Sequence, residues 1–101
     1  MNKDDQRRVD RLRDAAERLG GLGPRDDAVD IEVYPPPPGQ PKLAGLPQRM
    51  VLPAAVARPM AVSLLAAAER IEMVGWSLGQ PVSYQLEIAG VIVGEDLGHN
   101  R

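Results

Sequence analysis

The spacing of apolar residues predicts an amphipathic helix near the start of the chain, over residues 3–19. Its apolar positions follow a 3-4-3 spacing and would form one narrow face: Val9, Leu12, Ala16 and Leu19. Asn2 is suited to cap the first turn, and Gly20 is suited to end the helix. Since so short a helix is marginal by itself, we expect its apolar face to dock on the protein's own core or on another helix.

A second helical pattern begins at Pro59, which is acceptable in a first turn, and ends before Gly75. Its apolar residues are Ala61, Leu64, Leu65, Ala68, Ile71 and Val74. A narrow polar stripe interrupts them, formed by Ser63, Glu69, Arg70 and Glu72. A helix this apolar is normally buried, so the segment near residues 60–74 is predicted to be the centre of the fold.

Strict alternation of apolar and polar residues predicts strands in two places. Asp30 to Tyr34 places Ile31 and Val33 on one face of a short strand. Residues 82–88 alternate at every step, as expected of a strand with one covered face. Residues 91–93 would be either a second strand of a hairpin or a continuation of the same strand past a bulge at Gly90.

The middle of the chain carries a periodic series of prolines. They recur every six residues, at Pro35, Pro41, Pro47, Pro53 and Pro59. A proline inside an α-helix removes a hydrogen bond and clashes with the preceding turn. A polyproline II helix has three residues per turn, so prolines six residues apart would all lie along one side of it. We therefore predict an extended arm over residues 35–59, about 75 Å long at about 3.1 Å per residue. The alternative is an irregular loop that folds over the protein's own surface.

Together these patterns predict an α+β protein. The core would be one buried helix and a C-terminal antiparallel strand or hairpin, accompanied by the N-terminal amphipathic helix and the long extended proline-rich arm. The chain divides into residues 1–20 (helix), 21–34 (loop and short strand), 35–59 (arm), 60–94 (core) and 95–101 (polar tail).

Composition narrows the classes of partner. A net charge of -2 provides no general attraction to nucleic acid or to an anionic membrane, so we expect neither. The apolar run Met50 to Ala68 is interrupted by Pro53, Arg58 and Pro59, which argues against a membrane span. The first residues lack the apolar stretch of a secretory signal, so we predict a cytoplasmic protein.

Candidate chemistry is sparse. The chain has no cysteine, and its one histidine, His99, lies in the polar tail. Ser63, Ser77 and Ser83 sit in no recognisable nucleophile motif. The acidic group of Asp26, Asp27, Asp30 and Glu32 does not match the spacing of a calcium loop. We therefore expect no enzymatic activity, no catalytic set, no cofactor and no metal.

The stiff arm and its exposed apolar side chains favour a non-enzymatic assembly protein that binds protein subunits, in a homo-oligomer or a larger particle. A phage virion accessory protein of the capsid, head-tail junction or tail is one such case, and its location would then be the virion. The alternative is a small regulator or inhibitor, antitoxin-like or anti-defence, that binds a protein or DNA target. The predicted partner-binding residues are Tyr34, Pro35, Pro36, Pro37, Pro38, Leu43, Leu46, Met50, Leu52, Val56, Val9, Leu12 and Leu19.

Overall fold

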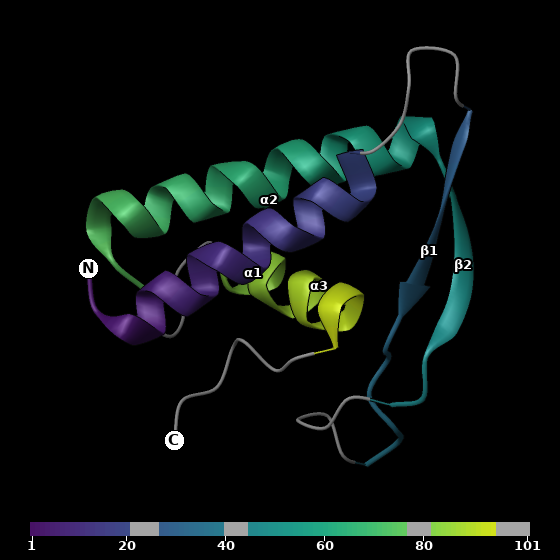
Figure 1. The fold of residues 1–101 in the computed structure, drawn as a ribbon, viewed down its shortest axis with the longest axis horizontal. Helices are drawn as coiled ribbons and strands as arrows, with labels where there is room; N and C mark the ends of the chain where they lie inside the picture. The colour runs from purple at the N-terminus through teal and green to yellow at the C-terminus, as the bar shows by residue number, and fades with distance from the viewer. Residues whose placement is uncertain (21–26, 40–44, 77–81, 95–101) are drawn as a thin grey trace.

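A computed structural model describes residues 1–20, 27–39, 45–76 and 82–94 of the 101-residue chain. Within them the protein forms three helices and a two-stranded antiparallel hairpin, a small α+β fold (Figure 1). The elements, in chain order, are α1 (Lys3–Gly20), β1 (Ala28–Val33), β2 (Gln48–Pro53), α2 (Ala54–Val74) and α3 (Ser83–Val93). The Cα radius of gyration is 13.5 Å, as expected for a compact domain of this length.

Helix α1 confirms the predicted amphipathic helix and its cap. The side-chain oxygen of Asn2 accepts a hydrogen bond of 2.7 Å from the backbone N–H of Asp5, which satisfies one of the free donors of the first turn. Near the other end, Arg18 donates to Asp14 across one turn at 3.3 Å. The predicted apolar face is buried along its whole length, together with Ala15.

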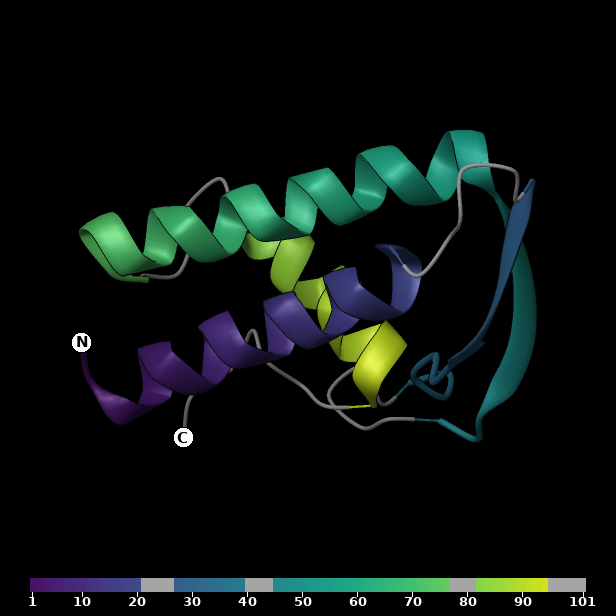
Figure 2. The same cartoon turned by 45° about the horizontal axis from the view of Figure 1, so that its top comes forward.

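The hairpin pairs the predicted strand near residue 31 with part of the predicted arm. Ile31 lies opposite Met50 in the antiparallel register, and Val29 lies opposite Leu52. These residues and Val33 share the face that packs against the helices, whereas the other face carries polar groups such as Glu32. The hairpin stands at the end of the helical layer where α1 ends and α2 begins (Figures 1 and 2).

Helix α2 corrects the predicted end of the extended arm. The helix begins at Ala54 rather than at Pro59, so residues 54–59 are helical and residues 35–59 do not form one extended segment. The backbone N–H of Ala54 donates to the carbonyl of Asp27 at 2.7 Å, which anchors the first turn to the hairpin. Pro59 lies inside the helix despite a typical cost of about 3 kcal/mol. Ala54 and Ala57 are nevertheless buried on the inner side of this first part of the helix.

Helix α3 replaces the predicted C-terminal strand or hairpin. Residues 83–93 are helical, and the buried positions Val82, Leu86 and Ala89 follow a helical 4-3 spacing. The helix ends at Gly94, which has φ 83° and ψ 23° and donates its N–H to the carbonyl of Gly90 at 2.8 Å.

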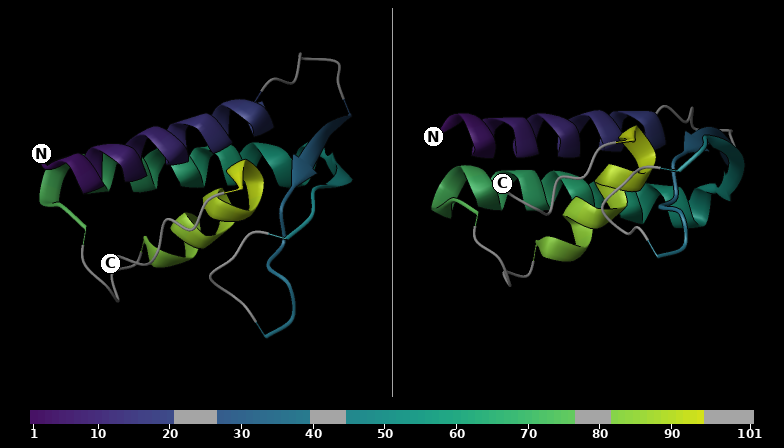
Figure 3. Two further views of the ribbon diagram at one scale, coloured as in Figure 1. Left: turned by 60° about the horizontal axis from the view of Figure 1, so that its bottom comes forward. Right: turned by 90° about the horizontal axis from the view of Figure 1, so that it is seen from below.

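The core lies among the three helices and the inner face of the hairpin. Helices α1 and α2 run side by side in opposite directions, and α3 crosses one side of this pair (Figures 1 and 3). The largest fully buried side chains come from all three helices: Val9, Leu12, Leu19, Leu64, Ile71 and Leu86. Among the described residues, no helix combines the length and hydropathy that crossing a bilayer requires.

Candidate protein interface

Among the described elements, α2 carries the most exposed large apolar side chains. Both α1 and α3 lie on the opposite side of the helix (Figures 1 and 2). The residues along the middle of the outer face recur at a 4-3-4-3-4 spacing, and all of them are exposed: Ala55, Pro59, Val62, Ala66, Glu69 and Met73. We call this row the α2 stripe.

Several large apolar side chains on this face are in contact with solvent. Met73 is 76% exposed and Val62 is 66% exposed, although both are as apolar as residues of the core. Leu65 and Val56 flank the stripe and are 49% and 44% exposed. A contiguous apolar face on a small protein commonly marks an interaction surface.

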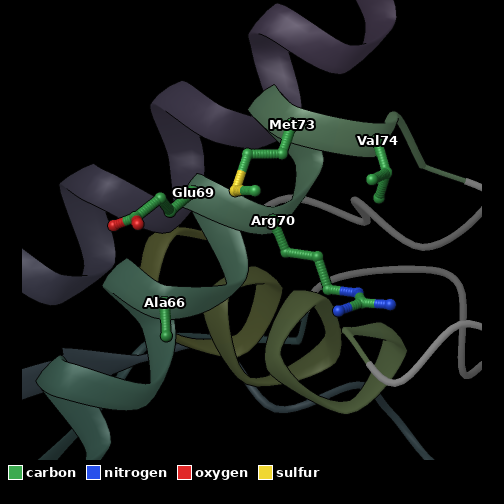
Figure 4. A pocket seen from close by; sticks show the side chains of 5 residues that line it. All are labelled: Ala66, Glu69, Arg70, Met73 and Val74. Atoms are coloured by element: carbon green, nitrogen blue, oxygen red, sulfur yellow. The ribbon is translucent and has the colours of Figure 1, made fainter.

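One end of the stripe is slightly hollowed, between Ala66 and Val74 (Figure 4). The hollow measures about 180 Å³, which is smaller than typical small-molecule sites of about 300 to 1,000 Å³. In Figure 4, Glu69 and Arg70 extend to opposite sides of the helix, with Met73 above the turn between them. This shape suits an apolar side chain of a protein partner better than a cofactor.

Charged residues lie within and beside the stripe, mainly towards its two ends. Arg58 lies near the beginning, whereas Glu69, Arg70 and Glu72 lie near the end. Glu72 accepts a hydrogen bond of 2.7 Å from Arg13 of α1, so its carboxylate is held on the α1 side of the face. Arg70 extends to the opposite side of the helix from Glu69 (Figure 4), so the side of the face nearer α1 is positive at its beginning and negative at its end.

A second, charged hollow lies where α1 meets the hairpin, and residues of both elements line it, including Arg18 and Glu32. Its charges pair with each other or with nearby groups: Arg49 donates to Asp30 at 2.8 Å, and Arg18 donates to the carbonyl of Ile92 at 3.2 Å. The hydrogen bond to Asp30, with the charge of that carboxylate, raises the pKa of Arg49. The arginines of this hollow therefore connect structural elements: Arg49 connects β2 to β1, and Arg18 connects α1 to α3.

Tyr34, predicted to bind a partner, is held within its own chain. Its backbone N–H donates to the carbonyl of Val91 at 2.6 Å, and its hydroxyl donates to Glu32 at 3.3 Å. The ring packs beside Gly94, where an added Cβ would lie 3.2 Å from the nearest ring carbons. Tyr34 therefore joins the hairpin to the end of α3.

The following prolines differ in exposure. Pro35 and Pro37 are half-buried, whereas Pro36 and Pro38 are exposed. Gly45 packs so closely on the carbonyl of Pro35 that a Cβ at residue 45 would collide with this oxygen. The two sides of the connection between the strands therefore touch at this point.

The other predicted partner residues fall into three groups. Val9, Leu12 and Leu19 are fully buried in the protein's own core, so their face is covered by its own chain. Leu46, Met50 and Val56 are exposed, and Leu52 is half-buried against the core. Leu43 lies outside the described residues.

The sequence reasoning missed most of the α2 stripe. It assigned Leu65 and its neighbours to a buried helix and did not consider Val62 or Met73 as partner residues. The sign available in the sequence was that the helix contains more apolar residues than one buried face requires.

Two of the candidate nucleophiles, Ser63 and Ser83, lie within the described residues. Ser63 accepts a hydrogen bond of 2.9 Å from Gln85, and the hydroxyl of Ser83 is buried. Ser77, Asp26 and His99 lie outside the described residues. Across the part of the chain that the structure describes, no three metal-ligating side chains come close enough to share an ion.

No model of a known family matches the chain, and neither a curated protein nor a solved structure is similar enough to count as a match.

Proposed function

We propose that this chain is a non-enzymatic interaction protein that assembles with protein subunits through the outer face of α2. The proposal keeps the class of function that the sequence favoured but moves the contact surface from an extended arm to a helix. A subunit or accessory protein of a larger particle, such as a phage virion, is one setting in which a chain of this kind would act.

The exposure of the α2 stripe carries the proposal. Its apolar side chains contribute little to the stability of the monomer, because they are exposed and the core lies on the other side of the helix. Covering such side chains contributes roughly 25 cal/mol for each Å² removed from water. A protein partner with an apolar surface would supply that cover, and the hollow beside Met73 would receive one of its side chains.

Site-specific photo-crosslinking tests the proposal. A photoreactive amino acid replaces Val62 in the full chain, which is expressed in the cells that naturally produce it. The control places the same amino acid at Glu17, an exposed polar position on α1. We expect protein adducts from position 62 and far fewer from position 17.

A protein captured at position 62 is then purified and its affinity for the chain is measured. Val62→Glu should weaken binding by about tenfold or more, because a buried carboxylate would lack a partner. Val51→Glu, at an equally exposed apolar position on the outer face of the hairpin, should leave the affinity unchanged. Absence of adducts at position 62, or equal labelling at both positions, would overturn the proposal.

A further inference from the structure

The spacing of the α2 stripe is compatible with a second copy of the chain as its partner. Its 4-3-4-3-4 spacing is symmetric about Leu64, so it reads the same way in both chain directions. A two-fold axis that crosses the outer face at the level of Leu64, whose own side chain is buried on the inner face, would place a second α2 antiparallel to the first, with the two stripes in register. Such a self-complementary surface is what a two-fold interface requires. We propose that the chain forms an antiparallel dimer through α2, an inference that rests on the proposed function.

The facing side chains match in size. In this arrangement Val62 meets Ala66 of the second copy, and Met73 meets Ala55 of the second copy. In both pairs a larger side chain lies opposite an alanine, which allows two helices to approach closely without a void, while the third pair places Glu69 opposite Pro59. Leu65 lies beside the axis, where the two copies of this half-exposed residue meet and extend the apolar contact.

The charges match as well. The antiparallel arrangement brings Arg58 of one copy beside Glu69 and Glu72 of the other, and the two-fold axis repeats this contact at both ends. Glu72 already accepts from Arg13, and Arg58 already interacts within its chain, so the new contacts extend existing networks. Contacts of this kind contribute more to orientation than to affinity.

The sizes and the charges of the facing side chains both disfavour a parallel dimer through the same face. It would place Glu69 opposite Glu69 and Met73 opposite Met73, so like charges would meet and volumes would not alternate. Among pairings of two α2 helices, charge and size therefore select the antiparallel one.

The size of the interface sets its strength. A helix of 21 residues is about 32 Å long at about 1.5 Å per residue, and one pair of helices buries an area at the low end of specific interfaces. We therefore expect a reversible dimer with a dissociation constant in the micromolar range.

Sedimentation velocity over the micromolar concentration range gives the first test. The wild-type chain should change from monomer to dimer as its concentration rises. Val62→Glu should raise the dissociation constant by about tenfold or more, whereas Val51→Glu should not change it. Circular dichroism of both variants verifies that they remain folded, as the exposure of both positions leads us to expect.

Charge reversal tests the direction of the helices. Arg58→Glu and Glu69→Arg should each weaken self-association, because each variant places like charges together at both ends. An equimolar mixture of the two variants should form a heterodimer with affinity near that of the wild type, since both ends regain opposite charges. In a parallel dimer like charges already meet in the wild type, so there the single variants would associate as tightly as the wild type and the mixture more tightly. Either of those results, or a mixture no tighter than each variant alone, would refute the antiparallel pairing.

Disulfide trapping gives an independent measure of direction, because the chain contains no cysteine of its own. Ala55 and Met73 are separated by about 27 Å along the helix, at about 1.5 Å per residue. Ala55→Cys should therefore crosslink efficiently with Met73→Cys in a mixture, and neither variant should crosslink with itself. Self-crosslinking of Ala55→Cys would instead reveal a parallel dimer and overturn the proposal.

These results separate the two proposals. A chain that stays monomeric at all concentrations, yet forms adducts from position 62 with a different protein, would refute the dimer and leave the proposed function standing. A monomeric chain with no adducts at that position would refute both.

Discussion

Arg8 near the start of α1 contacts Trp76 just after the end of α2. The guanidinium carbon of Arg8 lies 3.9 Å from the centre of the Trp76 ring. Arg8 also pairs with Asp5 at 3.0 Å and is only 4% exposed, so a cation is held almost out of water between an aromatic face and a carboxylate. This arrangement ties the residues just beyond α2 to the first turns of α1, because Trp76 directly follows Gly75, which ends α2.

Arg8→Ala should destabilise the protein by about 2 to 4 kcal/mol, because it removes the ring contact and leaves Asp5 buried without this partner. Urea denaturation followed by circular dichroism measures the free energy of unfolding. Arg7→Ala, at an exposed neighbouring position, should change it by less than about 0.5 kcal/mol. Equal effects of the two substitutions would contradict a structural role for the Arg8–Trp76 contact.

Two adjacent leucines of α2 should respond in opposite ways. Leu64 is 1% exposed and lies in the core, so Leu64→Ala should reduce the free energy of unfolding by about 2 to 5 kcal/mol. Leu65 is 49% exposed, so Leu65→Ala should have little effect on the unfolding of the monomer but should weaken self-association. Denaturation at low concentration and sedimentation at high concentration separate the two effects. A large loss of monomer stability in Leu65→Ala would show that the outer face of α2 is misassigned.

Gly45 should tolerate no side chain. A Cβ at this position would collide with the carbonyl of Pro35, so Gly45→Ala should cost about 1 to 3 kcal/mol as the connection between the strands shifts. Gly20→Ala is the control, because nothing lies within 4 Å of a Cβ added there. Thermal denaturation of both variants compares the two glycines, and a neutral Gly45→Ala would show that the two sides of the connection do not touch.

The cap of α1 should contribute measurably to stability. Asn2→Ala removes the acceptor for the N–H of Asp5 and should reduce the free energy of unfolding by about 1 kcal/mol. Asn2→Asp should retain most of the stability, since a carboxylate caps as well and suits the positive end of the helix dipole. If Asn2→Asp were as unstable as Asn2→Ala, the hydrogen bond would not be the source of the effect.

The prediction of a C-terminal strand was wrong because the pattern was read over too few residues. Residues 82–88 alternate, but Val82 and Leu86 are four positions apart, a spacing that fits both a strand and a helix. Ala89 and Ile92 continue the series at helical intervals and are buried in α3. A longer window would have favoured the helix.

The prediction of a long extended arm failed at its C-terminal end for a different reason. Pro59 and the residue before it both disfavour a helix locally, and that preference is real. In the structure Ala57 is part of the core, Ala54 is buried, and the carbonyl of Asp27 accepts from the first turn of α2, so the helix extends past Pro59 towards the hairpin. Neither contact is visible in the local sequence.

The candidate interface could be predicted only in part. Val56 was among the predicted partner residues and lies exposed at the edge of the α2 stripe, but it was assigned to an extended segment. Val62 and Met73 were not considered as partner residues, because a helix that is apolar on most sides does not show in its sequence which side is covered. The positions of α1 and α3 decide that.

The sequence by itself determined the amphipathic α1, its cap at Asn2 and the strand around Ile31, because these depend on spacing and on hydrogen bonds between near neighbours. Only the tertiary structure decided where α2 begins, that the chain forms a helix after residue 82, and which face of α2 meets solvent. Those outcomes depend on contacts between residues far apart in the chain, whose energies exceed the local preferences of proline and of an alternating pattern.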